Sequence, residues 1–213
     1  MIVPSPQRTG AVPASCDGAV PGKRERNRLK RRATIVAVAR RLFLEHGYAA
    51  TSMSSVAEAM GGSKATLWAH FASKEALFAD VADALVGGFA EQMDELLGGQ
   101  RFSIAGLREF CGRFLDALLS PESTTLLRMI IAESGRFPEL GEMFFARGPA
   151  QTVARLGRYF GGAFPPAEAS RLARVTLSAL VGFRTQVMME PRYAEPRALA
   201  GFVDDLIASL DLR

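Results

Sequence analysis

A glycine break between two short helical segments constrains the fold of this chain more than any other feature. The stretch over residues 51–74 reads TSMSSVAEAMGGSKATLWAHFASK. Its first segment, capped by a serine, carries apolar residues on one helical face, with spacing i, i+3, i+4 and i+7, at Met53, Val56, Ala57 and Met60. Gly61 and Gly62 are expected to end this helix, because glycine tolerates the left-handed conformation that helix ends often adopt.

The second segment is too short and too polar to be a core element. Ser63 is expected to cap it, and Leu67 and Phe71 are expected to point back toward the interior. The other side chains are rich in hydrogen-bond donors, namely Lys64, Thr66, Trp68 and His70. A helix, a tight turn and a donor-rich second helix make a helix-turn-helix, whose second helix lies in the major groove of DNA.

Charge is distributed unevenly along the chain. Residues 1–74 hold 12 Lys/Arg and 4 Asp/Glu, a net of +8, whereas residues 75–213 hold 14 and 18, a net of −4. A solubilising run of charge would explain residues 23–32 taken alone. The asymmetry together with the two-helix motif instead favours a polyanion-binding head on a body with another task.

Length and composition limit the class of protein. The chain has 213 residues, 48% of them hydrophobic, which is enough for a small domain and a second core. It has no uninterrupted apolar run of about 18 residues, so we expect no membrane-spanning helix, and prolines near the N-terminus argue against a secretory signal. The two cysteines, Cys16 and Cys111, suggest neither a disulfide framework nor a metal site. We expect a cytoplasmic protein without a cofactor.

The helical periodicities predict an all-α fold, since no alternating strand pattern occurs. Residues 1–27 are rich in Pro, Gly, Ser and Ala and are predicted to be disordered. Residues 28–75 are expected to form a three-helix, homeodomain-like helix-turn-helix domain. Residues 76–213 are expected to form a larger helical domain. A long helix capped by Ser73 would run from the head into this body.

The last two helices have the clearest periodicity, with Pro191 between them and Pro196 at the start of the second. One interpretation is an antiparallel hairpin that packs on its own body. The other, which we favour, is a four-helix dimer interface, because small residues (Ala173, Ser178, Gly182 and Ala198) would permit close approach of a second copy. The interface residues predicted in this way are Leu172, Val175, Ala179, Phe183, Phe202, Leu206 and Leu210.

Three motifs taken together resemble the tetracycline-repressor (TetR) family of bacterial transcriptional regulators. They are ARRLFLEHGY at residues 39–48, TSMSSVAEAMG at 51–61 and SKATLWAHFASKEALF at 63–78. The stretch LLRMIIAESGRFPEL at 126–140 is similar to the ligand domains of efflux-controlling members. The resemblance implies a repressor that binds a palindromic operator in double-stranded DNA as a homodimer and is released by a small apolar effector.

The resemblance also assigns roles to single residues in the head. Thr51 and Ser52 would bond phosphate oxygens, Ser63 to Thr66 would begin the recognition helix, and Lys74 would bond phosphate. The predicted DNA-binding residues are Thr51, Ser52, Ser54, Ser63, Lys64, Ala65, Thr66, Trp68, Ala69, His70 and Lys74. Two departures from the family pattern, Ala69 for a common aromatic residue and Gly62 for a usual valine, affect the expected operator strength and sequence rather than DNA binding itself. Trp68 and His70 have a second interpretation, as structural residues of the helix.

In the body, aromatic and methionine residues are frequent, and at helical spacing most of them belong to the core. The resemblance implies a ligand pocket among them, with candidate residues Phe89, Phe110, Phe114, Met129, Glu133, Phe144 and Phe183. Glu133 would be a polar anchor in that pocket, although a solvated surface carboxylate fits the same position.

Two other functions stay open at this point. In one, the DNA-binding dimer has a body that binds no small ligand and serves only oligomerisation or a protein partner. In the other, the helical bundle is an enzyme. The only histidines, His46 and His70, lie in the head, and the body has no metal-ligand spacing, G-x-S-x-G elbow or glycine-rich phosphate loop. We therefore predict a regulator and not an enzyme.

Overall fold

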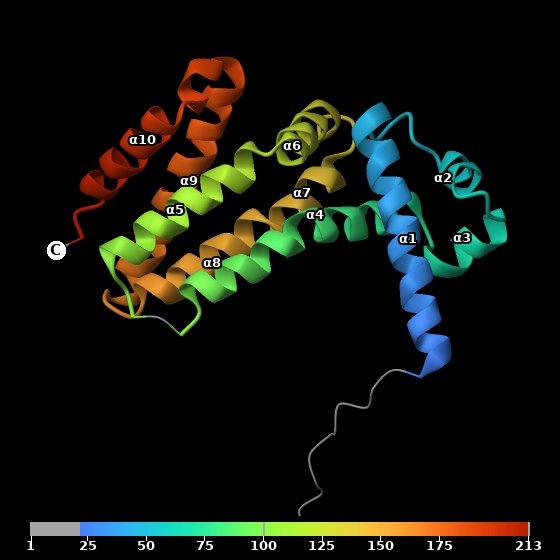
Figure 1. Ribbon diagram of the computed structural model, residues 1–213, viewed down its shortest axis with the longest axis horizontal. Coiled ribbons are helices and arrows are strands. Elements are labelled where there is room, and N and C mark those ends of the chain that lie inside the picture. The colour runs from blue at the N-terminus through green and yellow to red at the C-terminus, as the bar shows by residue number, and fades with distance from the viewer. Residues whose placement is uncertain (1–21, 100, 213) are drawn as a thin grey trace, which may run out of the picture.

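The computed structural model describes residues 22–99 and 101–212, and these ranges contain helices and short connections but no β-strand. The prediction of an all-α fold is confirmed. The head consists of α1 (Lys23–His46), α2 (Met53–Ala59) and α3 (Lys64–His70). From the head, α4 (Lys74–Leu97) runs along the body (Figure 1).

The body is a bundle built around α4. Its further helices are α5 (Ile104–Leu119), α6 (Pro121–Glu133), α7 (Pro138–Arg147), α8 (Pro149–Phe160), α9 (Pro166–Met189), the short 3-10 helix η1 (Pro191–Ala194) and α10 (Pro196–Ser209). In Figure 1, α4 and α8 lie side by side, α5, α9 and α10 form the end of the body farthest from the head, and α6 and α7 lie between that end and the head. No helix in the described ranges combines the length and apolarity that crossing a bilayer requires.

Two kinds of residue fix where the helices begin. Serines at the N-cap of α2 to α6 accept a hydrogen bond from a backbone N–H of the first turn. Prolines occupy the first turn of every helix from α6 to α10, where the missing N–H costs nothing. These local signals explain why the starts of α2, α3, α4 and α10 could be predicted from the sequence.

The start of α1 is a correction. It begins at Lys23, five residues before the expected start at Arg28, so residues 23–27 of the predicted disordered tail are helical. These residues are exposed and mostly charged, and Lys, Arg and Glu favour helices without adding an apolar stripe. Apolar periodicity therefore could not reveal them. Residues 1–21 of that predicted tail lie outside the described residues.

The described residues form two buried cores. One lies within the body and joins α4, α5, α8, α9 and α10. The other fills the head around Phe43, Tyr48 and Phe78, and it also contains Leu126, Ile130 and other residues of α6 and α7. The head is therefore not closed by its own three helices, because α4, α6 and α7 complete its core.

Candidate DNA-binding surface and effector cavity

The second helix of the motif, α3, is anchored by two apolar side chains. Leu67 is fully buried and Phe71 is 2% exposed. At the other end, the Ser63 hydroxyl accepts a hydrogen bond from the backbone N–H of Thr66 at 3.2 Å. Between α2 and α3, Gly61 has φ +59°, a conformation that side-chain-bearing residues rarely adopt. The turn and the anchors hold α3 with its polar side outward.

Arg32 of α1 ties the other end of α3 to the head. Its Nη1 donates to the carbonyl of His70 at 2.8 Å, and its Nε and Nη2 donate to the carboxylate of Asp80 at 2.7 and 2.9 Å. The guanidinium also lies 4.2 Å from the ring centroid of Phe71. Sequence analysis missed this role, because the partners of Arg32 lie 38 and 48 residues away.

Most of the predicted DNA-binding residues lie on one accessible part of the head. Those with exposed side chains are Ser52, Ser54, Ser63, Lys64, Ala65, Trp68 and Ala69, and those that are half-buried are Thr66, His70 and Lys74. Trp68 is 51% exposed, so its indole does not belong to the core. Hydroxyls, a lysine and an indole N–H thus lie along the outer side of α3, where they can meet base edges and phosphates.

Thr51 is a correction to the predicted set. It is 2% exposed, and its hydroxyl lies within hydrogen-bond distance of two carbonyl oxygens, 2.8 Å from Gly47 and 3.1 Å from Leu42. These carbonyls belong to the end of α1 and the loop after it, where helix geometry leaves acceptors unsatisfied. The Thr51 hydroxyl therefore stabilises the turn inside the head and is not available to a phosphate.

Lys74 begins α4 beside the ring of Tyr48. Its Nζ lies 4.0 Å from the ring centroid and 3.5 Å from the carbonyl oxygen of Ala49. Partial burial lowers the pKa of Lys74. The Tyr48 hydroxyl donates to the carboxylate of Glu75 at 3.0 Å, and burial together with this bond raises the pKa of Tyr48. The positive end of a helix with an ammonium group beside it is suited to an anion such as a phosphate.

In the body, a cavity of about 420 Å³ lies between helices α4 to α9. Its lining is mostly apolar and includes Phe114 and Phe144 from the predicted pocket. The other lining side chains are Leu85, Val86, Ala117, Leu118, Ser120, Glu122, Ser123, Leu126, Leu127, Phe145, Pro149, Thr152, Leu177, Val181 and Arg184. A cavity of this size and character fits a small, largely apolar molecule.

Four other predicted pocket residues, Phe110, Met129, Glu133 and Phe183, do not line this cavity. Phe110 and Phe183 are buried in the body core, and Met129 is buried in the head core. The Glu133 carboxylate accepts a hydrogen bond from the backbone N–H of Ala49 at 2.9 Å, so it joins α6 to the head. Helical spacing identified these as inward-facing residues. It does not tell whether such a residue faces the head core, the body core or the cavity. The side chain of Phe89 lies outside the described residues.

Among the lining residues that were not predicted from the sequence, Arg184 is the only arginine. It lies on the same face of α9 as Leu177 and Val181, with spacing i, i+4 and i+7, yet it is only 3% exposed. An arginine within an apolar stripe was the signal that could have found it.

The predicted dimer residues divide between core and surface. Leu172, Phe183, Leu206 and Leu210 are buried in the body core of the same chain, and Phe183 stacks on the half-buried Phe202 at 3.9 Å between ring centroids. Only Val175, 39% exposed, and in part Ala179 and Phe202 reach the surface. The strongest apolar stripe of each helix faces its own bundle, so it could not mark the surface offered to a second copy. The exposed face of α9 carries Val175, Ser178, Gly182, Gln186 and Met189.

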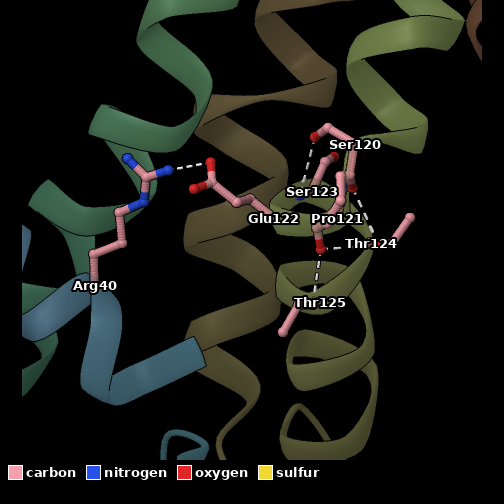
Figure 2. Close-up of polar contacts among 7 residues, drawn as sticks. All are labelled: Arg40, Ser120, Pro121, Glu122, Ser123, Thr124 and Thr125. Carbon is pink, nitrogen blue, oxygen red and sulfur yellow. Dashed lines mark hydrogen bonds and ion pairs between the residues drawn. The ribbon is translucent and has the colours of Figure 1, made fainter. Parts of the chain in front are cut away.

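A salt bridge connects α6 with α1. Figure 2 shows the guanidinium of Arg40, on α1, facing the carboxylate of Glu122, in the first turn of α6. Around Glu122, the Thr124 and Thr125 hydroxyls donate to the Pro121 carbonyl at 3.0 and 2.7 Å. Since Glu122 also lines the cavity, this pair links the cavity wall to the head.

Comparisons with known proteins agree with this architecture. The family model described as "Bacterial regulatory proteins, tetR family" matches residues 35–81, and the model described as "AefR-like transcriptional repressor, C-terminal domain" matches residues 105–164. The chain is 30% identical over 106 residues to the HTH-type transcriptional repressor ComR of Escherichia coli (strain K12). These 106 residues make up 49% of this chain and 50% of ComR. It spans about half the length of the curated relatives it matches.

Two solved structures are similar over most of their length. One is a TetR-family transcriptional regulator from Mesorhizobium loti, with a TM-score of 0.70 and 24% identity, covering 86% of this chain and 96% of that one. The other is the flavonoid-responsive regulator FrrA, with a TM-score of 0.61 and 30% identity, covering 85% and 95%.

Proposed function

Because the chain belongs to the tetR family of bacterial regulatory proteins, we propose that it is a repressor that binds a palindromic operator as a homodimer and is released by a small, largely apolar effector. It is a DNA-binding regulator and not an enzyme, since both matching family models describe regulators. Its place of action is the cytoplasm, where the operator lies.

The observation that carries the proposal is the presentation of α3. Leu67 and Phe71 hold the helix from behind, and the side chains of Lys64 and Trp68 are exposed on its outer side. Lysine neutralises phosphate without reading sequence, whereas the Thr66 methyl and hydroxyl can contact a base edge in the major groove.

The length of α3 supports the proposal of a homodimer. One seven-residue helix reads few base pairs, and a two-fold pair of heads reads two half-sites about 34–36 Å apart, or a multiple of that distance. The exposed face of α9 supports this assembly, because the small residues Ser178 and Gly182 lie between the larger Val175 and Met189. This face replaces the inward stripe as the proposed interface.

Release by an effector is supported by the cavity and by its connection to the head. A molecule held between α4 and α9 would shift the balance between two arrangements of the heads if it binds one of them more tightly. The Arg40–Glu122 pair and the Glu133–Ala49 hydrogen bond carry such a shift from α6 to the head. The cavity favours this proposal over a body that serves only oligomerisation, and FrrA, similar over most of its length, is named as responsive to flavonoids.

The first test is a mobility shift at low salt with the DNA fragment upstream of the protein's own gene. We expect a specific shift that weakens steeply as salt rises, because bound phosphates release counterions. A scrambled fragment of equal length is the control. No difference between the two fragments would contradict the repressor assignment, and a complex with one protomer per operator would contradict the homodimer.

A further inference from the structure

One charged group in the cavity has no counterion among the described residues. Arg184 is only 3% exposed, and it lines the cavity together with apolar side chains of α4 to α9. Its Nε has no hydrogen-bond partner among the described residues. Burial lowers the pKa of Arg184 to about 10, and no neighbouring carboxylate offsets this effect.

The other charged residue of the lining does not neutralise Arg184. The Glu122 carboxylate is paired with Arg40 of α1, and Figure 2 shows its side chain directed toward that arginine. The remaining polar lining residues, such as Ser120, Ser123 and Thr152, are neutral. The Arg184 guanidinium is therefore charged at pH 7 and buried in a mostly apolar cavity, and none of the described residues supplies it with a carboxylate.

An unpaired buried charge is unfavourable, and a bound anion would remove the cost. Arginine presents several N–H donors in a planar fork that matches a carboxylate. The apolar walls at the same time favour a molecule with a large apolar part.

We propose that the effector is an apolar molecule carrying one carboxylate, which pairs with Arg184 while its apolar part fills the cavity. This inference rests on the proposed function, since it names the chemical class of effector for the same cavity. It also accounts for an arginine in the middle of an otherwise apolar helix face.

The test uses matched acids and amides with the full-length protein in the absence of DNA. The probes are 2-naphthoate, 4-phenylbutanoate and decanoate, each against its primary amide, with Kd measured by titration calorimetry. We expect at least one acid to bind about 10- to 100-fold more tightly than its amide, as charge-assisted hydrogen bonds predict. Equal affinity within every pair, or no binding of any acid, would overturn the inference.

Variants of Arg184 test whether this residue causes the preference for the acid over its amide. Arg184→Met should abolish the preference for the acid, Arg184→Lys should retain part of it, and Arg128→Met, which removes an exposed arginine of α6, should leave it unchanged. The ligand-free Arg184→Met protein should also melt at a higher temperature than the parent, because an unpaired buried charge is gone. A lower melting temperature, or an acid preference that survives in Arg184→Met, would overturn the inference.

Measuring whether the acids and amides release the operator complex distinguishes a failure of this inference from a failure of the proposed function. If the acids bind through Arg184 but leave the operator complex intact, the site stands and release by an effector fails. If a neutral amide releases the operator as well as its acid does, release stands and the carboxylate inference fails.

Discussion

Small polar side chains in the head are of two kinds: some cap helices and remain exposed, and others are buried and bond only backbone groups of the head. The Ser52 and Ser63 hydroxyls accept hydrogen bonds from the first turns of α2 and α3, and both remain exposed. The Thr51 hydroxyl is buried and serves only the end of α1. Two cap hydroxyls and the open N-terminus of each helix therefore face outward, where backbone and side-chain donors can fix the register of docking.

Lys64 and Thr66 should affect binding in different ways. We expect Lys64→Ala to weaken binding to most duplex sequences alike and to lower the slope of log K against log salt by about one, because it removes one phosphate contact. Thr66→Ala should instead change the preferred base at one position, worth about 1–3 kcal/mol. Titrations at several salt concentrations, with operator variants, distinguish the two. A loss of sequence preference in Lys64→Ala at an unchanged salt slope would contradict this assignment.

Gly61 should be the glycine on which the turn depends. Gly61→Ala is expected to destabilise the protein by about 1 kcal/mol, because alanine resists φ +59° although space around the position is open. Gly112→Ala on α5, where a methyl group also meets no atom, should stabilise by about 0.5–1 kcal/mol. Urea unfolding gives both free energies, and the same sign for both variants would exclude backbone conformation as the cause.

At the scale of helices, α6 is one of the elements that connect the cavity with the head, together with α4 and α7. Leu126 and Leu127 line the cavity, Glu122 pairs with Arg40, and Glu133 accepts from Ala49. Both ends of α6 thus bond to the head, and its middle contributes both to the head core and to the cavity wall. A displacement of α6 by a ligand would therefore change the contacts of the loop before α2 as well as those of α1.

Arg40 should matter for communication and not for effector binding, because it does not line the cavity. We expect Arg40→Gln to leave the Kd for 2-naphthoate unchanged and stability within about 1 kcal/mol, as for other exposed pairs. The concentration of 2-naphthoate that releases half of the operator should change severalfold. Arg41→Gln, a neighbouring exposed arginine, is the control. An unaltered release curve would show that coupling does not pass through this pair.

Local signals in the sequence predicted the helices. The roles of single residues that could not be predicted depend on partners far away in the sequence. Ser63 as a cap and Leu67 as an anchor depend on residues within one or two turns. The role of Glu133 depends on Ala49, 84 residues away, and the role of Arg32 depends on Asp80. Periodicity showed that Leu172 faces an apolar environment, but it does not tell whether the same chain or a second copy provides it.

At the scale of the whole molecule, the exposed face of α9 determines assembly in our proposal. Val175 and Met189 are among the most exposed large apolar residues of the described chain, at 39% and 76%. Gly182 lies between them, and a Cβ atom added there would meet no atom outside its own stretch of helix within 4 Å. The face is therefore free in one protomer and suited to close contact with another.

Gly182→Arg should break the homodimer without unfolding the protomer. In a single protomer the arginine side chain would lie at the surface. In a dimer its charge and volume would be buried between the two chains, which is unfavourable. We expect a mass of one protomer by light scattering and a weaker operator complex, with unchanged helical circular dichroism. Ala154→Arg on the exposed side of α8 should remain dimeric. A dimer in Gly182→Arg would place the interface elsewhere.

The core shared between head and body limits how such a protein can be recombined. Leu126, Ile130 and Leu140 supply part of the apolar interior on which α1 and the loop before α2 rest. A chimera joined to a foreign sensor just after α3 would leave that interior facing unmatched side chains. New operator specificity is thus more readily gained by substitutions along α3 than by exchanging whole heads, unless α6 and α7 are transplanted with them.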